Sequence, residues 1–154
     1  MNFINPVSAK PKPFFEVGKV GKDFGQEIMQ SAAVIKQVLS RPIDGLNIVT
    51  THPSKTLDDI QLYGWKSPVR THTDATGYIF FVPLEIESND YLQVGTETHQ
   101  LEVGMLYALD DYFPHSTAGL GKVVAAFYGS VPRESISRPL LNEVLKAFQD
   151  KLNP

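Results

Sequence analysis

Short β-type segments separated by turn residues fill the middle of this chain, and they constrain its fold more than any other feature. Each is rich in β-branched or aromatic residues or alternates apolar with polar ones, and clusters of Gly, Pro, Asn, Asp or Ser lie between them. Many short strands of this kind favour a sandwich or a jelly-roll barrel. The predicted strands are Phe14–Val17, Leu46–Thr50, Asp59–Trp65, Thr71–Leu84, Tyr91–Val94, Leu101–Leu109 and Lys122–Tyr128.

Two amphipathic helices flank the predicted strands. From Gln26 to Leu39, apolar residues recur at intervals of three and four, and Pro42 lies just beyond this segment. A second apolar stripe runs from Leu140 to Leu152, directly after Pro139. Each stripe needs an apolar surface to cover, so we expect both helices to pack outside the sheet, or to mediate a homodimer. The predicted fold class is mainly β with flanking helices, a jelly-roll barrel, in one domain spanning residues 1–154.

Composition narrows the classes of function. The chain has 154 residues, a hydrophobic share of 42% and a net charge of −3, which is typical of a soluble globular protein. Scattered basic residues give no support for nucleic-acid binding, and no apolar run is long enough to span a membrane. The first residues do not resemble a secretion signal, so we expect a cytoplasmic protein. Because the chain has no cysteine, any metal ligands must be imidazoles and carboxylates.

His72, Asp74 and His115 are the candidate metal ligands. His72 and Asp74 are two residues apart in a segment predicted to be extended, so their side chains would lie on one face of a strand. In a jelly roll, a late strand can bring His115 beside them. Two His and one carboxylate match the ligand set of non-haem Fe(II) oxygenases. The alternative is that the first two are ordinary polar residues of a surface strand and that His115 belongs to a loop after Pro114.

The two other histidines have no place in this hypothesis. His52 lies in a Thr-His-Pro-Ser segment and His99 in a Thr-Glu-Thr-His-Gln segment. Both segments are typical of turns. We therefore predict that His52 and His99 are exposed turn residues outside the site.

Residues Asp59 to Tyr128 resemble the small 2-oxoglutarate and Fe(II)-dependent oxygenases, which share a prolyl-hydroxylase-like double-stranded β-helix. The matching pieces, in order, are DIQLYGW, the HTD motif, Gly104 with the strand before the distal His115, and Gly121-Lys122. The resemblance implies Fe(II) as cofactor, 2-oxoglutarate as cosubstrate, and hydroxylation of a small molecule or a protein side chain.

The resemblance also implies residues that bind the cosubstrate. A basic residue after the distal His pairs with the C5 carboxylate in that family, and Lys122 is the best match, with Arg133 as the other candidate. The family more often has Arg, and many members place it about ten residues after the His, whereas Lys122 follows His115 by seven. Gln61, Tyr63 and Tyr78 resemble the polar residues that family members direct at the cosubstrate.

The cupins are the alternative resemblance. Gly104 and His115 also fit the spacing of the second cupin motif, a glycine followed eleven residues later by a histidine. The first cupin motif normally supplies two His and then a Glu, whereas Asp74 stands at the second His position here, which favours the oxygenase. Two other functions stay open, a cupin-like metal-dependent enzyme or small-ligand binding protein without 2-oxoglutarate, and a barrel-shaped interaction protein without a metal.

Overall fold

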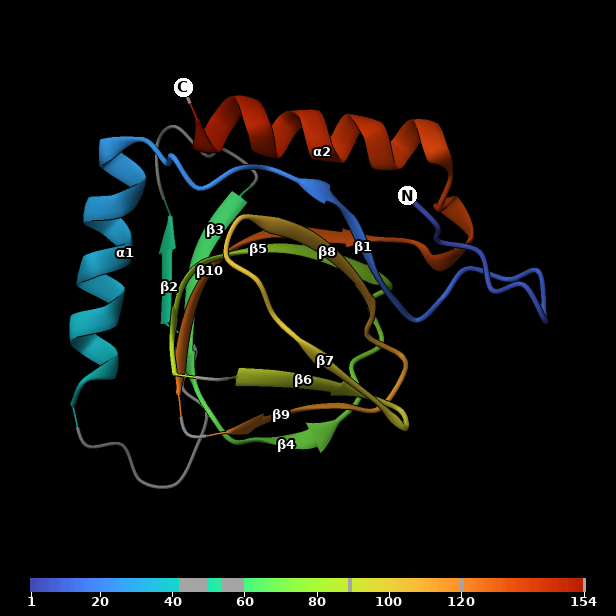
Figure 1. The fold of residues 1–154 in the computed structure, drawn as a ribbon, viewed down its shortest axis with the longest axis horizontal. Helices are drawn as coiled ribbons and strands as arrows, with labels where there is room; N and C mark the ends of the chain where they lie inside the picture. The colour runs from blue at the N-terminus through green and yellow to red at the C-terminus, as the bar shows by residue number, and fades with distance from the viewer. Residues whose placement is uncertain (42–49, 54–59, 89, 120, 154) are drawn as a thin grey trace.

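A computed structural model describes residues 1–41, 50–53, 60–88, 90–119 and 121–153. In these residues, two antiparallel sheets face each other, and two helices lie outside the larger sheet (Figure 1). The elements are β1 (Phe14–Lys19), α1 (Gln26–Leu39), β2 (Thr50–Pro53), β3 (Ile60–Lys66), β4 (Val69–His72), β5 (Tyr78–Glu87), β6 (Asp90–Val94), β7 (Glu97–Gln100), β8 (Met105–Asp110), β9 (His115–Gly119), β10 (Lys122–Val131), a 3-10 turn (Arg133–Ser135) and α2 (Arg138–Leu152).

The order of the strands identifies the fold. The larger sheet has the order β1-β8-β5-β10-β3-β2 and the smaller sheet the order β4-β9-β6-β7. From β3 onward the chain passes back and forth between the two sheets, with only the β6–β7 hairpin staying in one of them. This alternation winds the strands into a barrel. The fold is a cupin-like, double-stranded β-helix jelly roll, as the predicted fold class states.

Strand alternation divides the buried side chains into two cores. Along β10, Val123 and Ala125 belong to a barrel core between the sheets, whereas Val124 and Ala126 belong to an outer core with the helices. Glycine at position 64 lets α1 approach β3 closely, because a Cβ there would lie 2.3 Å from Leu39 Cδ1. The helices contribute one apolar stripe each to the outer core, Ile28, Ala32, Ile35 and Leu39 from α1 and Leu141, Val144, Phe148 and Leu152 from α2.

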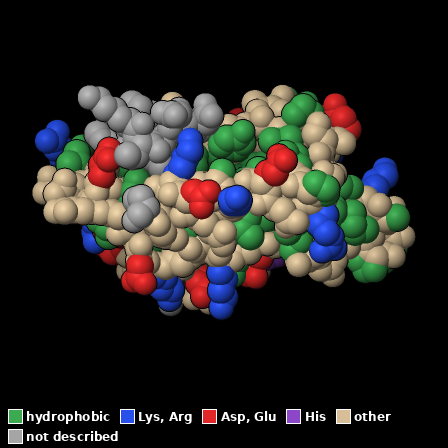
Figure 2. All heavy atoms as spheres, turned by 90° about the horizontal axis from the view of Figure 1, so that it is seen from above, with side chains coloured by type: hydrophobic (Ala, Val, Ile, Leu, Met, Phe, Trp, Pro, Cys, Tyr) green, Lys and Arg blue, Asp and Glu red, His purple; other side chains and the backbone are tan. Residues whose placement is uncertain are grey.

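The surface over α2 carries both signs of charge. Figure 2 views this face from above, and its basic side chains are interspersed with acidic ones. Among the described residues, this face therefore has no stripe of one charge that would track a phosphate backbone. Within the same part of the chain, no helix is both long and apolar enough to cross a membrane.

Most predicted elements are confirmed, and the main differences concern strands of the smaller sheet. The helix predicted from Gln26 to Leu39 has those bounds, and the second helix begins at Arg138, two residues earlier than predicted. The segment predicted as one extended run from Thr71 to Leu84 is instead two strands, β4 and β5, separated by a loop. Strands β4 and β9 are short and polar, so they lack the hydrophobic pattern on which strand prediction relies.

His52 and His99 were predicted to lie in turns, but both lie in strands. Strand β2 includes His52, whose backbone pairs with Leu62 of β3. The predicted strand Leu46–Thr50 lies outside the described residues, except for its last residue. Because β2 is an edge strand, it tolerates Pro53. His99 lies in β7, and its ring packs on Phe14 at a centroid distance of 4.6 Å.

Candidate metal centre

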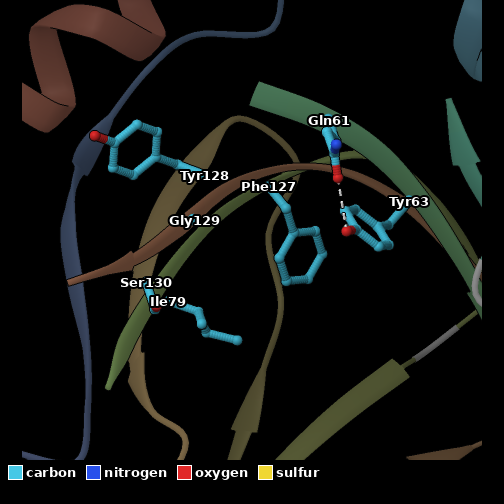
Figure 3. A pocket seen from close by; sticks show the side chains of 7 residues that line it. All are labelled: Gln61, Tyr63, Ile79, Phe127, Tyr128, Gly129 and Ser130. Carbon is cyan, nitrogen blue, oxygen red and sulfur yellow. Dashed lines mark hydrogen bonds between the residues drawn. The ribbon is translucent and has the colours of Figure 1, made fainter. Parts of the chain in front are cut away.

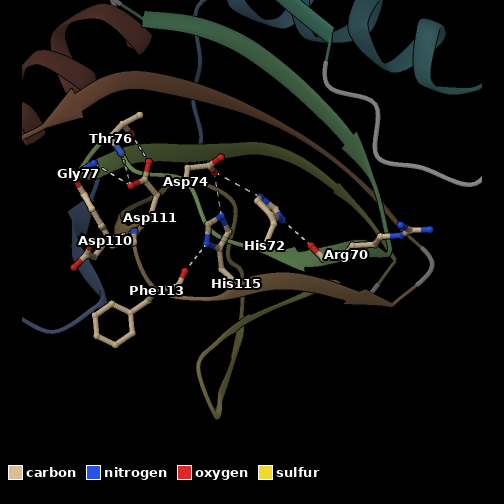
Figure 4. A network of polar contacts seen from close by, with 10 residues as sticks. Arg70, His72, Asp74, Thr76, Gly77, Asp110, Asp111, Phe113 and His115 are labelled. Carbon is tan, nitrogen blue, oxygen red and sulfur yellow. Dashed lines mark hydrogen bonds and ion pairs between the residues drawn. The ribbon is translucent and has the colours of Figure 1, made fainter.

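Three predicted ligands lie together where β4 pairs with β9 (Figure 4). Asp74 Oδ2 lies 3.7 Å from Nε2 of His72 and 3.7 Å from Nε2 of His115. The ring centroids of the two histidines are 4.3 Å apart, and one potential ligand atom from each of the three residues lies within 4.8 Å of the others. The structure therefore brings together two imidazoles and one carboxylate.

The pairing of β4 with β9 produces the histidine pair. His72, the last residue of β4, lies opposite His115, the first residue of β9. His115 also lies opposite Val94 of β6, whose side chain is part of the barrel core. Paired residues project from the same face of a sheet, so both imidazoles face the barrel interior.

Backbone carbonyls fix the tautomer of both rings. His72 Nδ1 lies 2.6 Å from the carbonyl oxygen of Arg70, and His115 Nδ1 lies 2.8 Å from that of Phe113. Because a carbonyl can only accept, each Nδ1 carries the proton and donates it. Each Nε2 then presents its lone pair to the space beside Asp74. This orientation is typical of histidines that bind metals.

A loop, and not strand alternation, brings Asp74 to the histidines. The prediction placed His72 and Asp74 on one face of a continuous strand, but β4 ends at His72. The backbone N–H of Asp74 donates to the carbonyl of Asp111 over 2.8 Å. This bond holds the loop between β4 and β5 against the loop between β8 and β9, so it fixes Asp74 relative to His115.

Asp111 is a buried carboxylate that the sequence analysis did not identify. Its side chain accepts hydrogen bonds from the backbone N–H groups of Thr76 and Gly77 at 3.1 and 2.9 Å, and from the hydroxyl of Thr76. All three donors belong to the loop that carries Asp74. The sequence has two adjacent aspartates, Asp110 and Asp111, shortly before Pro114. Nothing in the sequence shows that the second carboxylate turns inward.

The three candidate ligands differ in exposure. The side chain of His115 is 9% exposed, whereas those of His72 and Asp74 are 42% and 55% exposed. His115 is thus fixed by its surroundings, and the other two line the approach from solvent.

The donor set fits a divalent transition metal. Ligand atoms bound at about 2.1 Å and about 90° to one ion lie about 3 Å apart, so the 3.7 Å separations need small side-chain rotations to close. The exposed side chains of His72 and Asp74 are free to make them. Three protein ligands leave the other positions of a six-coordinate ion open.

The residues predicted to bind a cosubstrate are in different places. Gln61 and Tyr63 line an open pocket against the larger sheet, where the Tyr63 hydroxyl donates to Gln61 Oε1 over 2.8 Å. Tyr78 does not face the barrel interior, since its ring belongs to the outer core and its hydroxyl donates to the carbonyl of Lys12 over 2.5 Å. Burial, followed by the negative charge of Asp110, raises the pKa of Tyr78. The predicted role of Tyr78 is corrected accordingly.

The two candidate anchors for a carboxylate have different surroundings. Lys122 shares its face of β10 with Val124 and Ala126, so strand alternation directs it toward the helix side of the sheet. Arg133 follows β10, and its Nε donates to Asp110 Oδ2 over 2.8 Å while its guanidinium lies 4.6 Å from the centre of the Tyr112 ring. Arg133 thus pairs with Asp110 through Nε, and its side chain is 46% exposed.

No protein-family model matches the chain, and no curated protein matches it in sequence. Among solved structures, an RmlC-like cupin protein from Desulfovibrio desulfuricans has 13% identity and a TM-score of 0.42, over 59% of this chain and 90% of that chain. Salicylate 1,2-dioxygenase from Pseudaminobacter salicylatoxidans has 12% identity and a TM-score of 0.47, over 79% of this chain and 36% of that chain. At such identities the likeness concerns the fold, which the strand order above defines independently.

Proposed function

We propose that this protein is a cupin-like, metal-dependent oxygenase in which His72, Asp74 and His115 bind Fe(II). The observation that carries the proposal is the pair of Nε2 atoms, both oriented by backbone carbonyls and both 3.7 Å from one carboxylate oxygen. A bound Fe(II) would supply the reaction with O₂, which no protein side chain performs by itself. The chain's part is to hold the three donors and to keep the remaining positions accessible.

Metal binding tests this proposal directly. Purified protein, stripped with a chelator, is titrated anaerobically with Fe(II) and separately with Co(II), whose visible spectrum reports the number of ligands. We expect one ion per chain, and a loss of at least tenfold in affinity for His72→Ala and for Asp74→Ala. His99→Gln is the matched control, because it removes an imidazole that packs on Phe14 and lies outside the site.

Two results would contradict the proposal. If the wild-type protein binds no divalent ion, an interaction protein with a vestigial metal site becomes the better explanation. Equal loss of affinity in His99→Gln and His72→Ala would show that the effect is not specific to the three ligands. Turnover of O₂ then separates an oxygenase from a metal-dependent binding protein.

Dependence on 2-oxoglutarate is the narrower form of the proposal. It requires a basic residue that pairs with the C5 carboxylate of 2-oxoglutarate. Of the two candidates, Arg133 is favoured because its partner Asp110 directly precedes Asp111 of the site in the sequence. If 2-oxoglutarate is the cosubstrate, adding it anaerobically to the Fe(II) protein produces a visible charge-transfer band that Arg133→Met removes and Lys122→Met keeps. Absence of that band in the wild-type Fe(II) protein would refute the cosubstrate and leave the metal proposal intact.

Three other expectations stay predictions. They are the cytoplasmic location, the homodimer, and the choice between a small-molecule and a protein side-chain substrate.

A further inference from the structure

An open pocket of about 520 Å³ lies against the larger sheet, and its lining residues are half-buried or exposed. Figure 3 shows Gln61, Tyr63, Phe127 and Ile79 with their side chains around one hollow. Its volume falls in the range of about 300–1,000 Å³ that is typical of small-molecule sites. The pocket is lined by Gln61, Tyr63, Ile79, Phe127, Tyr128, Gly129 and Ser130.

The pocket and the candidate metal centre lie at the same end of the barrel. Val131 of β10, which follows the pocket residues Gly129 and Ser130, pairs with Tyr78 at the start of β5. The loop that carries Asp74 leads directly into that start. Gln61, Tyr63, Ile79 and Phe127 come from the larger sheet, and the metal ligands come from the opposite side of the barrel. Both sets point inward (Figures 3 and 4), whereas the Tyr128 ring packs on the outer core.

One wall of the pocket is a fixed aromatic surface. The ring of Phe127 contacts Phe81 in a stacked arrangement at 5.2 Å, and it contacts Tyr63 and Trp65 edge-on at 4.9 and 6.1 Å. Contacts with three other rings restrict the rotation of the Phe127 ring. A flat apolar surface of this kind favours a flat ligand, which can pack against it over its whole face.

The pocket also lacks charge. Of the described residues that line it, none is Lys, Arg, Asp or Glu, and its polar groups are hydroxyls and one amide. The Tyr63 hydroxyl already donates to Gln61 Oε1, which leaves the Tyr63 oxygen as an acceptor for a ligand. An anionic group placed against this wall would lose part of its hydration and would gain no cation from the lining residues, whereas an uncharged group has less hydration to lose.

We propose that this pocket binds an uncharged aromatic molecule, presented by Phe127 and Tyr63 to the candidate metal centre as its substrate. The substrate role rests on the proposed function, whereas binding of the ring in the pocket does not. The ligand packs its face on Phe127 and directs a hydroxyl or another hydrogen-bonding group toward the polar side chains of the rim.

Two probes of nearly equal size test the class of ligand. Benzyl alcohol is uncharged and benzoate is an anion at pH 7. Each is titrated into metal-free protein and followed by the fluorescence of Trp65, the only tryptophan in the sequence, and by the NMR shift of the Gly129 amide. We expect benzyl alcohol to bind at least tenfold more tightly than benzoate. Equal affinities would overturn the assignment to an uncharged ligand.

Gly129 offers a clean way to block the pocket. A Cβ added there meets no atom within 4 Å, so a larger side chain fills the hollow without displacing the backbone. We expect Gly129→Leu to weaken benzyl alcohol binding at least tenfold and Gly129→Ala to weaken it much less. Asn142→Leu, which adds the same side chain to the exposed surface of α2, is the matched control. Wild-type affinity in Gly129→Leu would overturn the location.

A last measurement separates the pocket from the metal. Bound Mn(II) should speed the relaxation of the aromatic protons of benzyl alcohol, compared with bound Zn(II), because the substrate role requires the ring to lie beside the ion. Binding without this effect would overturn the substrate role. Binding of benzyl alcohol by wild-type protein that takes up no metal would refute the proposed function and support the pocket assignment.

Discussion

Replacing Asp111 tests whether the loop that carries Asp74 is held in place by this buried carboxylate. Asp111→Ala removes the acceptor of three hydrogen bonds and leaves the N–H groups of Thr76 and Gly77 without their partner. Hydrogen bonds to a charged acceptor contribute about 1.5–3 kcal/mol each, and loop relaxation recovers part of the loss. We therefore expect the free energy of unfolding to fall by about 3–5 kcal/mol.

Asp111→Asn should behave differently. The amide oxygen can still accept from the two N–H groups, and the amide NH₂ can donate to the Thr76 hydroxyl, which then acts as acceptor. Only the charge is lost, so we expect a cost of about 1–2 kcal/mol. In urea denaturation of metal-free protein, the free energy of unfolding should increase in the order Asp111→Ala, Asp111→Asn, wild type.

Metal affinity then separates positioning from stability. Asp74 stays covalently present in both variants, and its N–H can still donate to the backbone carbonyl of residue 111. Asp111→Ala removes the three bonds to Thr76 and Gly77, so the loop should hold Asp74 less firmly beside His115. We expect a loss of about 10- to 100-fold in Co(II) affinity for Asp111→Ala, the range seen for residues that orient ligands, and a smaller loss for Asp111→Asn. If folded Asp111→Ala binds Co(II) as tightly as wild type, the positioning role is wrong even if the stability falls as expected.

Three further predictions concern stability. Gly64→Ala should lower the free energy of unfolding by about 1–3 kcal/mol through overpacking, because the new Cβ would lie 2.3 Å from Leu39 Cδ1; an unchanged thermal midpoint would contradict this. Burial raises the pKa of Tyr107 from 10.0 to about 12, so the folded state holds the phenol proton more tightly than the unfolded state. The free energy of unfolding should therefore decline as the pH rises from 10 to 12, and it should decline less steeply in Tyr107→Phe. Urea midpoints measured across this pH range check the prediction. Arg133→Met should cost about 1–3 kcal/mol because it leaves the buried carboxylate of Asp110 without its cation, and Arg133→Lys should restore part of this; equal urea midpoints for Arg133→Met and wild type would argue against the pair.

Helix α1 and the metal ligands illustrate what the sequence could predict. The bounds of α1 follow from a stripe of apolar residues with the period of a helix, which needs no knowledge of the rest of the chain. The three ligands were predicted from residue type, from their order and from a family resemblance. The structure confirms that they lie together, although their binding of a metal stays a prediction.

Lys122 and Tyr78 show that the sequence does not tell which face of a strand a residue occupies. Both lie next to or within segments that are apolar on both faces, because the larger sheet is buried by the barrel core on one side and by the helices on the other. Polarity alone then does not tell which residues face inward. Asp111 was missed for a related reason, since its partners are backbone N–H groups that have no signature in the sequence.

The pairing of β4 with β9 has a consequence for the order of folding. The Ser67 hydroxyl donates to Thr117 Oγ1 across 50 residues, and His72 pairs with His115 in the same ladder. Such a long-range contact requires the intervening chain to close into a loop, which costs conformational entropy. During synthesis, the three candidate ligands can therefore meet only once His115 of β9 has emerged from the ribosome. A metal held by these residues would stabilise contacts that form late and would not nucleate the early part of the fold.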